Sequence, residues 1–289
     1  MTTNPIALSA AAWSAGIDFE LEFWRDWART RGGRWPEDFS ARLQAGRKLD
    51  AGLELLLPLG GASRVLDVGA GPVTVLGTES TGRTIHVLAA DPLASLYERI
   101  LAEFDIVPPI RTVFATAEDL SAFFAPSTFD LVHCRNALDH SFDPVRGIEE
   151  MLRVVRTGGH VVLRHFINEA ECEAVGGQYM GFHQFNFDQK DGRFHIWNKQ
   201  AGVFPEELMR CRCTFTTAVD LELRSIEVVV RKTREFEDAC DGGRFRQRVC
   251  DATEGLISHS VSLALDNLKY RDLQGPADDQ TLRIIPTAR

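Results

Sequence analysis

A short apolar run at 64–68 ends in a glycine-rich turn, and this junction constrains the fold more than any other feature of the chain. Asp67 precedes Gly69 and Gly71, and a glycine lets the backbone approach a ligand without a Cβ in the way. Asp91 follows the next apolar run. Acidic side chains after two successive strands predict a parallel sheet with a nucleoside-like ligand at its carboxyl edge, where Asp91 can accept both hydroxyls of a ribose.

Strand-like and helix-like patterns alternate through residues 62–232, which is typical of a doubly wound, Rossmann-like α/β sheet. Asp143 and Pro144 are expected to begin a helix after the fourth strand. Gly158 and Gly159 are expected to stop that helix. The strands are predicted at 64–68, 84–90, 111–114, 129–133, 160–165, 214–219 and 226–231.

A helical cap is predicted at residues 1–60, before a domain that spans 61–232. Within the cap, the large apolar residues Phe19, Phe23, Trp24 and Trp27 share one helical face, and charged residues, Glu20 included, lie around it. Together with Trp13 and Trp35, these tryptophans are expected to pack the cap onto the main body. Stacking of one tryptophan on a ligand is the alternative.

Two further segments extend the predicted domain. An insertion at 166–204 carries aromatic runs on both sides of Asp191 and Gly192, which is a hairpin signal. A C-terminal extension at 233–289 contains one helical pattern, and it can serve as a lid, a packing helix or a homodimer contact. The pattern consists of Leu256, Ile257, Val261, Leu265 and Leu268.

Composition excludes several classes of partner. The net charge of −9 argues against a general surface for DNA or RNA, and the basic run at 244–248 reads as a solvated face. No apolar run is long enough for a membrane span, and the N-terminus lacks the basic region of a signal peptide. The six cysteines are scattered without a CxxC pair, which is typical of reduced thiols in a cytoplasmic protein.

The order of these motifs resembles the class I S-adenosylmethionine-dependent methyltransferases over about residues 60–232. Residues 65–71 are similar to the family's first motif, and Asp91 to its ribose-binding acid. Residues 113–120 resemble its adenine loop and 129–132 its fourth-strand motif. The two closing strands resemble a sheet of seven strands, mostly parallel, in which the last strand is reversed.

This resemblance implies S-adenosylmethionine as cofactor, with Asp67 near the ammonium group. Val73 departs from the family where a third glycine is common, and Thr116 stands where an aspartate often contacts adenine, so Glu118 can take over that contact. A dinucleotide-binding domain is the alternative, but Asp67 would lie badly beside a phosphate. The implied cofactor-binding residues are Asp67, Gly69, Ala70, Gly71, Asp91, Pro92, Thr116, Ala117, Glu118, Arg135 and Asn136.

The loops after strands four and five are expected to face the methyl acceptor. Asp139 and His140 place a carboxylate beside an imidazole, and His140 is the first candidate for a general base. His183, among aromatic residues, is the second candidate. Alternatively, His140 orients its loop and His183 lies in a small aromatic core. No metal site is expected, because the spacing of Asp139, His140, His165 and His183 fits no compact ligand motif.

The appendages indicate an enclosed site, which suits a small organic acceptor better than a polymer. The expected activity is therefore methyl transfer to an oxygen or nitrogen of a sugar-like or natural-product molecule. A protein or peptide methyltransferase would need an open groove. A third option is a domain that binds the cofactor only to regulate a partner.

Overall fold

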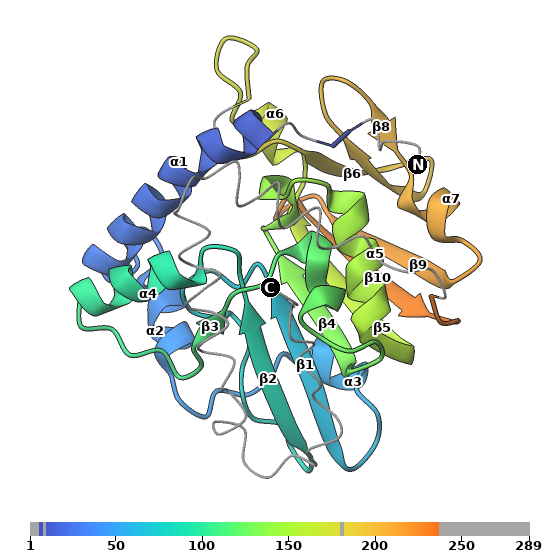
Figure 1. Ribbon diagram of the computed structural model, residues 1–289, viewed down its shortest axis with the longest axis horizontal. Coiled ribbons are helices and arrows are strands. Elements are labelled where there is room, and N and C mark those ends of the chain that lie inside the picture. Colours follow the sequence, from blue (N-terminus) through green and yellow to red (C-terminus); the bar gives the residue numbers. More distant parts are fainter. Residues whose placement is uncertain (1–5, 8–9, 180–181, 237–289) are drawn as a thin grey trace.

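The structure is a computed structural model that describes residues 6–7, 10–179 and 182–236 (Figure 1). Its core is one sheet in the order β3-β2-β1-β4-β5-β10-β9, in which β10 runs antiparallel to β5 and to β9. This is the predicted doubly wound α/β sheet with its last strand reversed. The strands are β1 Ala62–Val68, β2 Thr84–Ala90, β3 Thr112–Val113, β4 Phe129–Arg135, β5 Val155–Phe166, β9 Cys213–Asp220 and β10 Ser225–Lys232.

The segment between β4 and β5 confirms the predicted start of its helix and corrects the predicted end. The Asp143 side chain accepts a hydrogen bond from the Arg146 amide at 3.1 Å and caps α5 (Pro144–Val154). The helix ends at Val154, before the two glycines that were expected to stop it. A Cβ on Gly159 would lie 2.6 Å from the Asp130 carbonyl oxygen, so this glycine instead permits close approach of β4 and β5.

Alternate side chains of the strands face two apolar layers. Leu66 and Val68 of β1 join the larger core with α4 (Ala94–Glu103) and α5. Val65 faces the opposite way and packs with Leu53 of the short helix α3 (Ala51–Leu55). The sheet is therefore buried on both faces, and its polar loops gather at the carboxyl edge.

The loop from β1 to β2 differs from the expected alternation, because residues 69–83 contain no helix within the described chain. The Thr74 hydroxyl donates to Asp67 Oδ2 at 2.5 Å, and the Arg42 guanidinium donates to the Val73 carbonyl at 2.7 Å. Val73 is fully buried. The bulkier residue at the expected third-glycine position thus anchors an irregular loop, and the described residues between Gly71 and β2 form no helix.

Helix α1 (Ala10–Arg29) confirms a helix in the N-terminal segment, but its inward face is rotated from the predicted one. It packs beside α4 (Figure 1). Phe19 and Phe23 are 44% and 39% exposed, whereas Trp27 is buried. The inward stripe consists of Trp13, Ile17, Glu20, Trp24 and Trp27. After α1 comes α2 (Pro36–Leu43), which begins at the predicted proline.

The insertion forms the predicted hairpin between β6 (Asn186–Lys190) and β7 (Arg193–Trp197). Asp191 and Gly192 both have positive φ, at 53° and 75°, as the tight turn requires. β8 (Gly202–Val203) adds a third strand. Short helices flank this small sheet: α6 (Glu169–Cys172) precedes it and α7 (Pro205–Met209) follows it.

Two predicted features of the C-terminal segment are not described by the structure, and the prediction that no segment spans a membrane is tested only for the described residues. The helical pattern at 256–268 and the basic run at 244–248 lie outside the described residues. Among the described helices, none combines the length and apolar character that a bilayer crossing requires.

Candidate functional site

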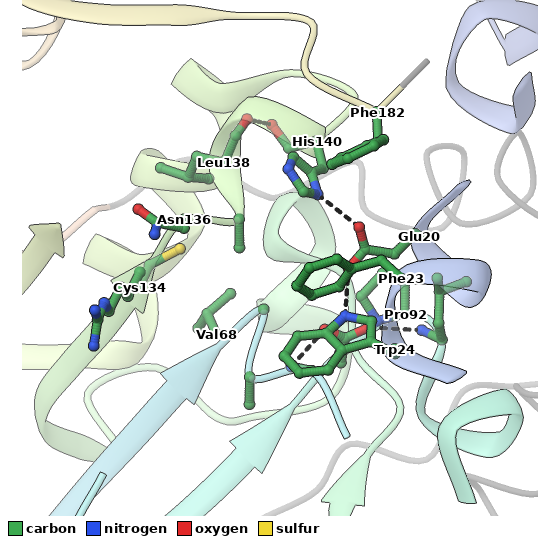
Figure 2. Close-up of a pocket in the computed structure, with 18 of the residues that line it drawn as sticks. Glu20, Phe23, Trp24, Val68, Pro92, Cys134, Asn136, Leu138, His140 and Phe182 are labelled. Atoms are coloured by element: carbon green, nitrogen blue, oxygen red, sulfur yellow. Dashed lines mark hydrogen bonds and ion pairs between the residues drawn. The ribbon is translucent and has the colours of Figure 1, made fainter. Parts of the chain in front are cut away.

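A cavity of about 610 Å³ opens at the carboxyl edge of the sheet, beneath α1. Figure 2 shows Phe23 and Trp24 projecting from α1 towards Val68 at the end of β1, and His140 facing Glu20. Almost every predicted site residue lines this cavity, although the sequence scatters them over more than a hundred positions. The lining includes Asp67, Gly69, Ala70, Gly71, Asp91, Pro92, Thr116, Ala117, Glu118, Arg135, Asn136, His140 and His183.

The glycine-rich turn is closely enclosed. Gly69 and Gly71 have φ values of 68° and 64°, a region that favours glycine. A Cβ on Gly69 would lie 2.2 Å from the Ala137 Cβ, and a Cβ on Gly71 would lie 2.7 Å from the Trp24 ring. The turn therefore requires glycine both for its backbone conformation and for the approach of two other segments.

Replacing Gly69 with Ala is expected to lower the free energy of unfolding by about 3 kcal/mol, from left-handed backbone strain and the collision with Ala137. Gly82→Ala is the matched control. Gly82 has a φ of 79° but nothing within 4 Å of its virtual Cβ, so only the strain of about 1 kcal/mol is expected. Urea denaturation of both variants measures the difference. Equal losses would contradict the close approach.

Asp91 occupies the cavity wall at the end of β2. Its Oδ2 accepts from the Gly71 amide at 3.0 Å and its Oδ1 from the Leu93 amide at 2.9 Å. Burial raises the pKa of Asp91 to about 7, against the lowering effect of these two hydrogen bonds. Since hydroxyl donors would stabilise the charged form further, the carboxylate is well placed for a diol.

Thr116 and Glu118 lie at the next strand end. The Thr116 hydroxyl is buried and meets no hydrogen-bond partner within the described chain. Glu118 Oε1 accepts from the amides of Phe142 and Asp143, at 2.6 and 3.0 Å, and burial raises the pKa of Glu118 to about 7. A polar atom without a partner on a cavity wall indicates a ligand group there.

Asp67 is more constrained than its motif suggests. Its Oδ1 lies 2.7 Å from His133 Nδ1, and its Oδ2 accepts from the Thr74 hydroxyl. Both partners are buried. The carboxylate is thus held rigidly at the cavity wall, and each oxygen retains one lone pair for a further donor.

A cluster of acids and imidazoles forms the other end of the cavity. Asp139 Oδ2 lies 2.5 Å from His183 Nδ1 and 3.2 Å from His140 Nε2. His140 Nδ1 in turn lies 3.2 Å from Glu20 Oε2 of α1. Asp139 is buried and contacts the cavity only through these two imidazoles, which line it. The fold therefore brings together all three predicted catalytic residues and adds Glu20.

The carboxylates favour positive charge at this cluster. Burial opposes protonation of His140, but the charges of Asp139 and Glu20 raise its pKa well above the ordinary value. For His183, burial likewise opposes protonation, and its hydrogen bond to Asp139 raises the pKa. An imidazole already protonated cannot accept a proton, so His140 is a poor general base in this state.

His165 does not join the cluster. It lies in β5 against the Phe187 ring, with 4.3 Å between the ring centroids. It is buried, and neither ring nitrogen has a hydrogen-bond partner among the residues that the structure describes. Burial lowers the pKa of His165 to about 4.

Protonation of His165 should therefore destabilise the fold in acid. The unfolded chain binds a proton at His165 near pH 6.5 and the folded chain near 4, so stability falls as the pH drops through this window, by about 3 kcal/mol in all. Asp91 and Glu118, whose pKa values burial raises to about 7, change the stability in the opposite sense over the same window, so the His165 contribution is measured as a difference between variants.

Urea denaturation at pH 7 and pH 4 is compared for the unaltered protein and for His165→Leu, in which the change on acidification should be about 3 kcal/mol more favourable; replacement of the partly exposed His86 is the control. The same pH dependence in His165→Leu and in the unaltered protein would refute this origin.

Residues 66–163 match the family model described as a methyltransferase domain, and the strand order agrees with the sheet expected for it. The chain contains a class I methyltransferase domain. An uncharacterized methyltransferase of Mycobacterium tuberculosis is 34% identical over 111 residues, which cover 38% of this chain and 42% of the relative. A ubiquinone/menaquinone biosynthesis C-methyltransferase of Idiomarina loihiensis is 29% identical over 135 residues, covering 45% and 52%.

Solved structures are similar as well. A Thermotoga maritima protein described as a possible histamine N-methyltransferase aligns with a TM-score of 0.43 and 16% identity, covering 73% of this chain and 99% of the other. The chain spans about half, or less, of the length of the curated relatives it matches. The similarity to those relatives thus concerns the methyltransferase domain and leaves the acceptor side open.

S-adenosylmethionine is the cofactor of this family, and the cavity of the methyltransferase domain fits it. The wall offers a buried carboxylate at Asp91, a glycine cradle and the Thr116 hydroxyl, which has no hydrogen-bond partner among the described residues. A dinucleotide fits poorly, because its pyrophosphate is bound at a helix N-terminus. The described loop from Gly71 to β2 contains no helix, and Asp67 would place negative charge beside the phosphates.

Three acidic residues at the site were missed from the sequence. Glu20 was grouped with the charged residues around the apolar face, although its spacing from Trp13, Ile17, Trp24 and Trp27 alternates between four and three residues, which is a helical stripe. Glu169 and Glu173 also line the cavity. No sequence signal identifies these two, because they reach the site only through the fold of the insertion.

Proposed function

We propose that the protein transfers the methyl group of S-adenosylmethionine to an oxygen or nitrogen of a small organic acceptor. The observation that carries the proposal is a single cavity with the cofactor loops at one end and the cluster of Asp139, His140 and His183 at the other. A cavity of about 610 Å³ lies within the range of small-molecule sites.

Asp91 would hold the ribose hydroxyls, and the turn at Gly69 and Gly71 would lie against the methionine portion. Thr116 and Glu118 would contact the adenine. Arg135 and Asn136 extend the wall past the end of β4. When bound, S-adenosylmethionine supplies an electrophilic methyl group, which an acceptor lone pair takes while the electrons of the broken C–S bond stay on sulfur.

The protein's own contribution is then to align the acceptor and to promote loss of its proton. The cluster of Asp139, His140 and His183 is the group of this cavity best suited to that task. His183 is the better candidate of the two imidazoles, because, against the effect of burial, the charges of Asp139 and Glu20 raise the pKa of His140 well above its ordinary value. Phe182 lies beside His140, with 5.3 Å between the ring centroids, and provides an apolar surface for the acceptor.

The enclosure of the cavity by α1 and the insertion supports a small-molecule acceptor over a protein or peptide acceptor. Trp24 of α1 stands over Gly71, and Glu20 of the same helix pairs with His140. The N-terminal segment also reaches the insertion, since the Asn198 amide donates to the Ile6 carbonyl at 3.0 Å. A cofactor-binding regulator would need no second polar cluster in its cavity.

An acceptor screen tests this proposal. Purified protein is incubated with S-adenosylmethionine and separate pools of sugars, phenols, amines, quinols and basic peptides, and S-adenosylhomocysteine is quantified. Release above background with a hydroxylated or amino small molecule is the expected result. If release occurs only with quinols, mass spectrometry of the product identifies the methylated atom. Methylation of carbon, as the name of the Idiomarina relative states for that protein, would refute the proposed acceptor class. Release only with peptides, or with no pool, would refute the proposed acceptor class.

A further inference from the structure

We propose that Asp139, His140 and His183 hold a divalent metal ion that binds an oxygen atom of the acceptor. This inference rests on the proposed methyl transfer and identifies how the cluster acts in it. No metal site was expected from the sequence, because two of the residues are adjacent and the third follows 43 residues after His140 (183 − 140). The insertion brings His183 back to the loop after β4.

The three candidate ligand atoms converge on one point. Asp139 Oδ2, His140 Nε2 and His183 Nδ1 are separated by 3.2, 3.2 and 2.5 Å. A metal ion about 2.1 Å from each of three ligands at right angles needs ligand atoms about 3 Å apart. Two imidazoles and one carboxylate on one side of an ion leave its other positions open, here towards the cavity.

The two imidazole nitrogens are difficult to explain without a cation. His140 Nε2 and His183 Nδ1 lie 3.2 Å apart, and both face the same Asp139 oxygen. If both carried protons, two positively polarised N–H groups would crowd one acceptor. The second oxygen, Asp139 Oδ1, is buried and meets no hydrogen-bond partner within the described chain. A metal ion would satisfy the two nitrogens and Oδ2 at once, and it would also satisfy Oδ1 if the carboxylate bound it through both oxygens.

The outer nitrogens supply the strongest independent support. A metal-bound histidine almost always donates its other ring N–H to a carboxylate, a carbonyl or water. His140 Nδ1 lies 3.2 Å from Glu20 Oε2, and His183 Nε2 lies 3.3 Å from Glu173 Oε2. Each imidazole thus has a carboxylate within ion-pair distance of its outer nitrogen, one from α1 and one from the segment after α6.

The surrounding charge also matches a cation. Glu169 Oε2 lies 3.9 Å from His183 Nδ1, so four carboxylates surround two imidazoles. Imidazole and carboxylate together suit Zn²⁺, Co²⁺, Ni²⁺, Fe²⁺ or Mn²⁺ rather than Ca²⁺. Such an ion attracts a hydroxyl or alkoxide oxygen and repels an ammonium group, which favours an oxygen acceptor.

The test uses the full-length protein without a polyhistidine tag, stripped with a chelator and titrated with Co²⁺. Calorimetry gives the stoichiometry, and visible absorption reports the ligand field. One equivalent is expected to bind. Asp139→Asn and His183→Gln should each weaken binding by about 100-fold or more, and Glu20→Gln by about 10-fold through the lost partner of His140. His195→Gln, a histidine of the same insertion outside the cluster, should change nothing.

Every protein in this series is also titrated with S-adenosylhomocysteine, which reports an intact fold and an intact cofactor end. Absence of Co²⁺, Zn²⁺ and Mn²⁺ binding at millimolar concentrations, in protein that binds S-adenosylhomocysteine, would overturn the metal site alone and leave an acid–base cluster. Metal binding that survives the Asp139 and His183 replacements would also overturn it. Absence of S-adenosylhomocysteine binding in the unaltered protein would instead count against the proposed function.

Discussion

Replacing Asp91 with Ala is expected to weaken S-adenosylmethionine binding by about 100-fold or more. The buried carboxylate would accept hydrogen bonds from the ribose hydroxyls, and each hydrogen bond to a charged group contributes about 1.5–3 kcal/mol. The variant also leaves the amides of Gly71 and Leu93 without their acceptor. Calorimetry with S-adenosylmethionine and S-adenosylhomocysteine measures the loss.

Two control variants separate the ribose contact from a general disturbance. Asp91→Asn keeps the side-chain volume and one acceptor oxygen, so an intermediate loss of about 10-fold is expected. Asp18→Asn alters an exposed aspartate of α1 and should bind like the unaltered protein. Full affinity in Asp91→Ala would remove Asp91 from the cofactor site.

Replacing His183 with Ala is expected to slow methyl transfer by about 100-fold to 10,000-fold while leaving cofactor affinity within a factor of about two. His183 contacts Asp139 at the acceptor end of the cavity. It is distant in sequence from the glycine turn and is not among the nearest neighbours of Gly69 or Gly71. Turnover is measured with the acceptor identified by the screen, and binding by calorimetry.

His195→Ala is the matched control for this prediction. His195 belongs to the same insertion, pairs with Asp188 and contacts the Phe204 ring, so its loss tests the effect of disturbing the hairpin alone. Equal slowing in both variants would assign His183 a role in folding the insertion. Unchanged turnover in His183→Ala would exclude the cluster from proton transfer and from acceptor binding.

Local patterns were sufficient to predict most of the sheet. β2 has the predicted bounds, and the helix after β4 begins at the predicted cap, because period-two apolar runs and an Asp-Pro pair act within a few residues. The sequence did not predict that the segment between β1 and β2 would lack a helix. Pro72, Gly77 and Thr78 disfavour a helix there, and contacts with residues 47–48 hold the loop instead.

The acceptor end could be predicted only in part. Asp139 and His140 follow a strand and so were assigned to the carboxyl edge. Their carboxylate neighbours come from α1 and from the insertion, and long-range contacts of this kind leave no local pattern. Glu20 is the exception. Its position in an apolar stripe identifies an inward-facing charge, and a buried charge requires a partner.

The central claim is that the cavity beneath α1 binds S-adenosylmethionine. Calorimetric titration of the purified protein with S-adenosylmethionine, S-adenosylhomocysteine and NAD⁺, side by side, tests it most directly. We expect one molecule of each sulfur-containing ligand to bind per chain and no heat from NAD⁺, because the turn after β1 offers Asp67 and no helix N-terminus to a pyrophosphate. Binding of NAD⁺ alone, or of none of the three ligands, would contradict the account.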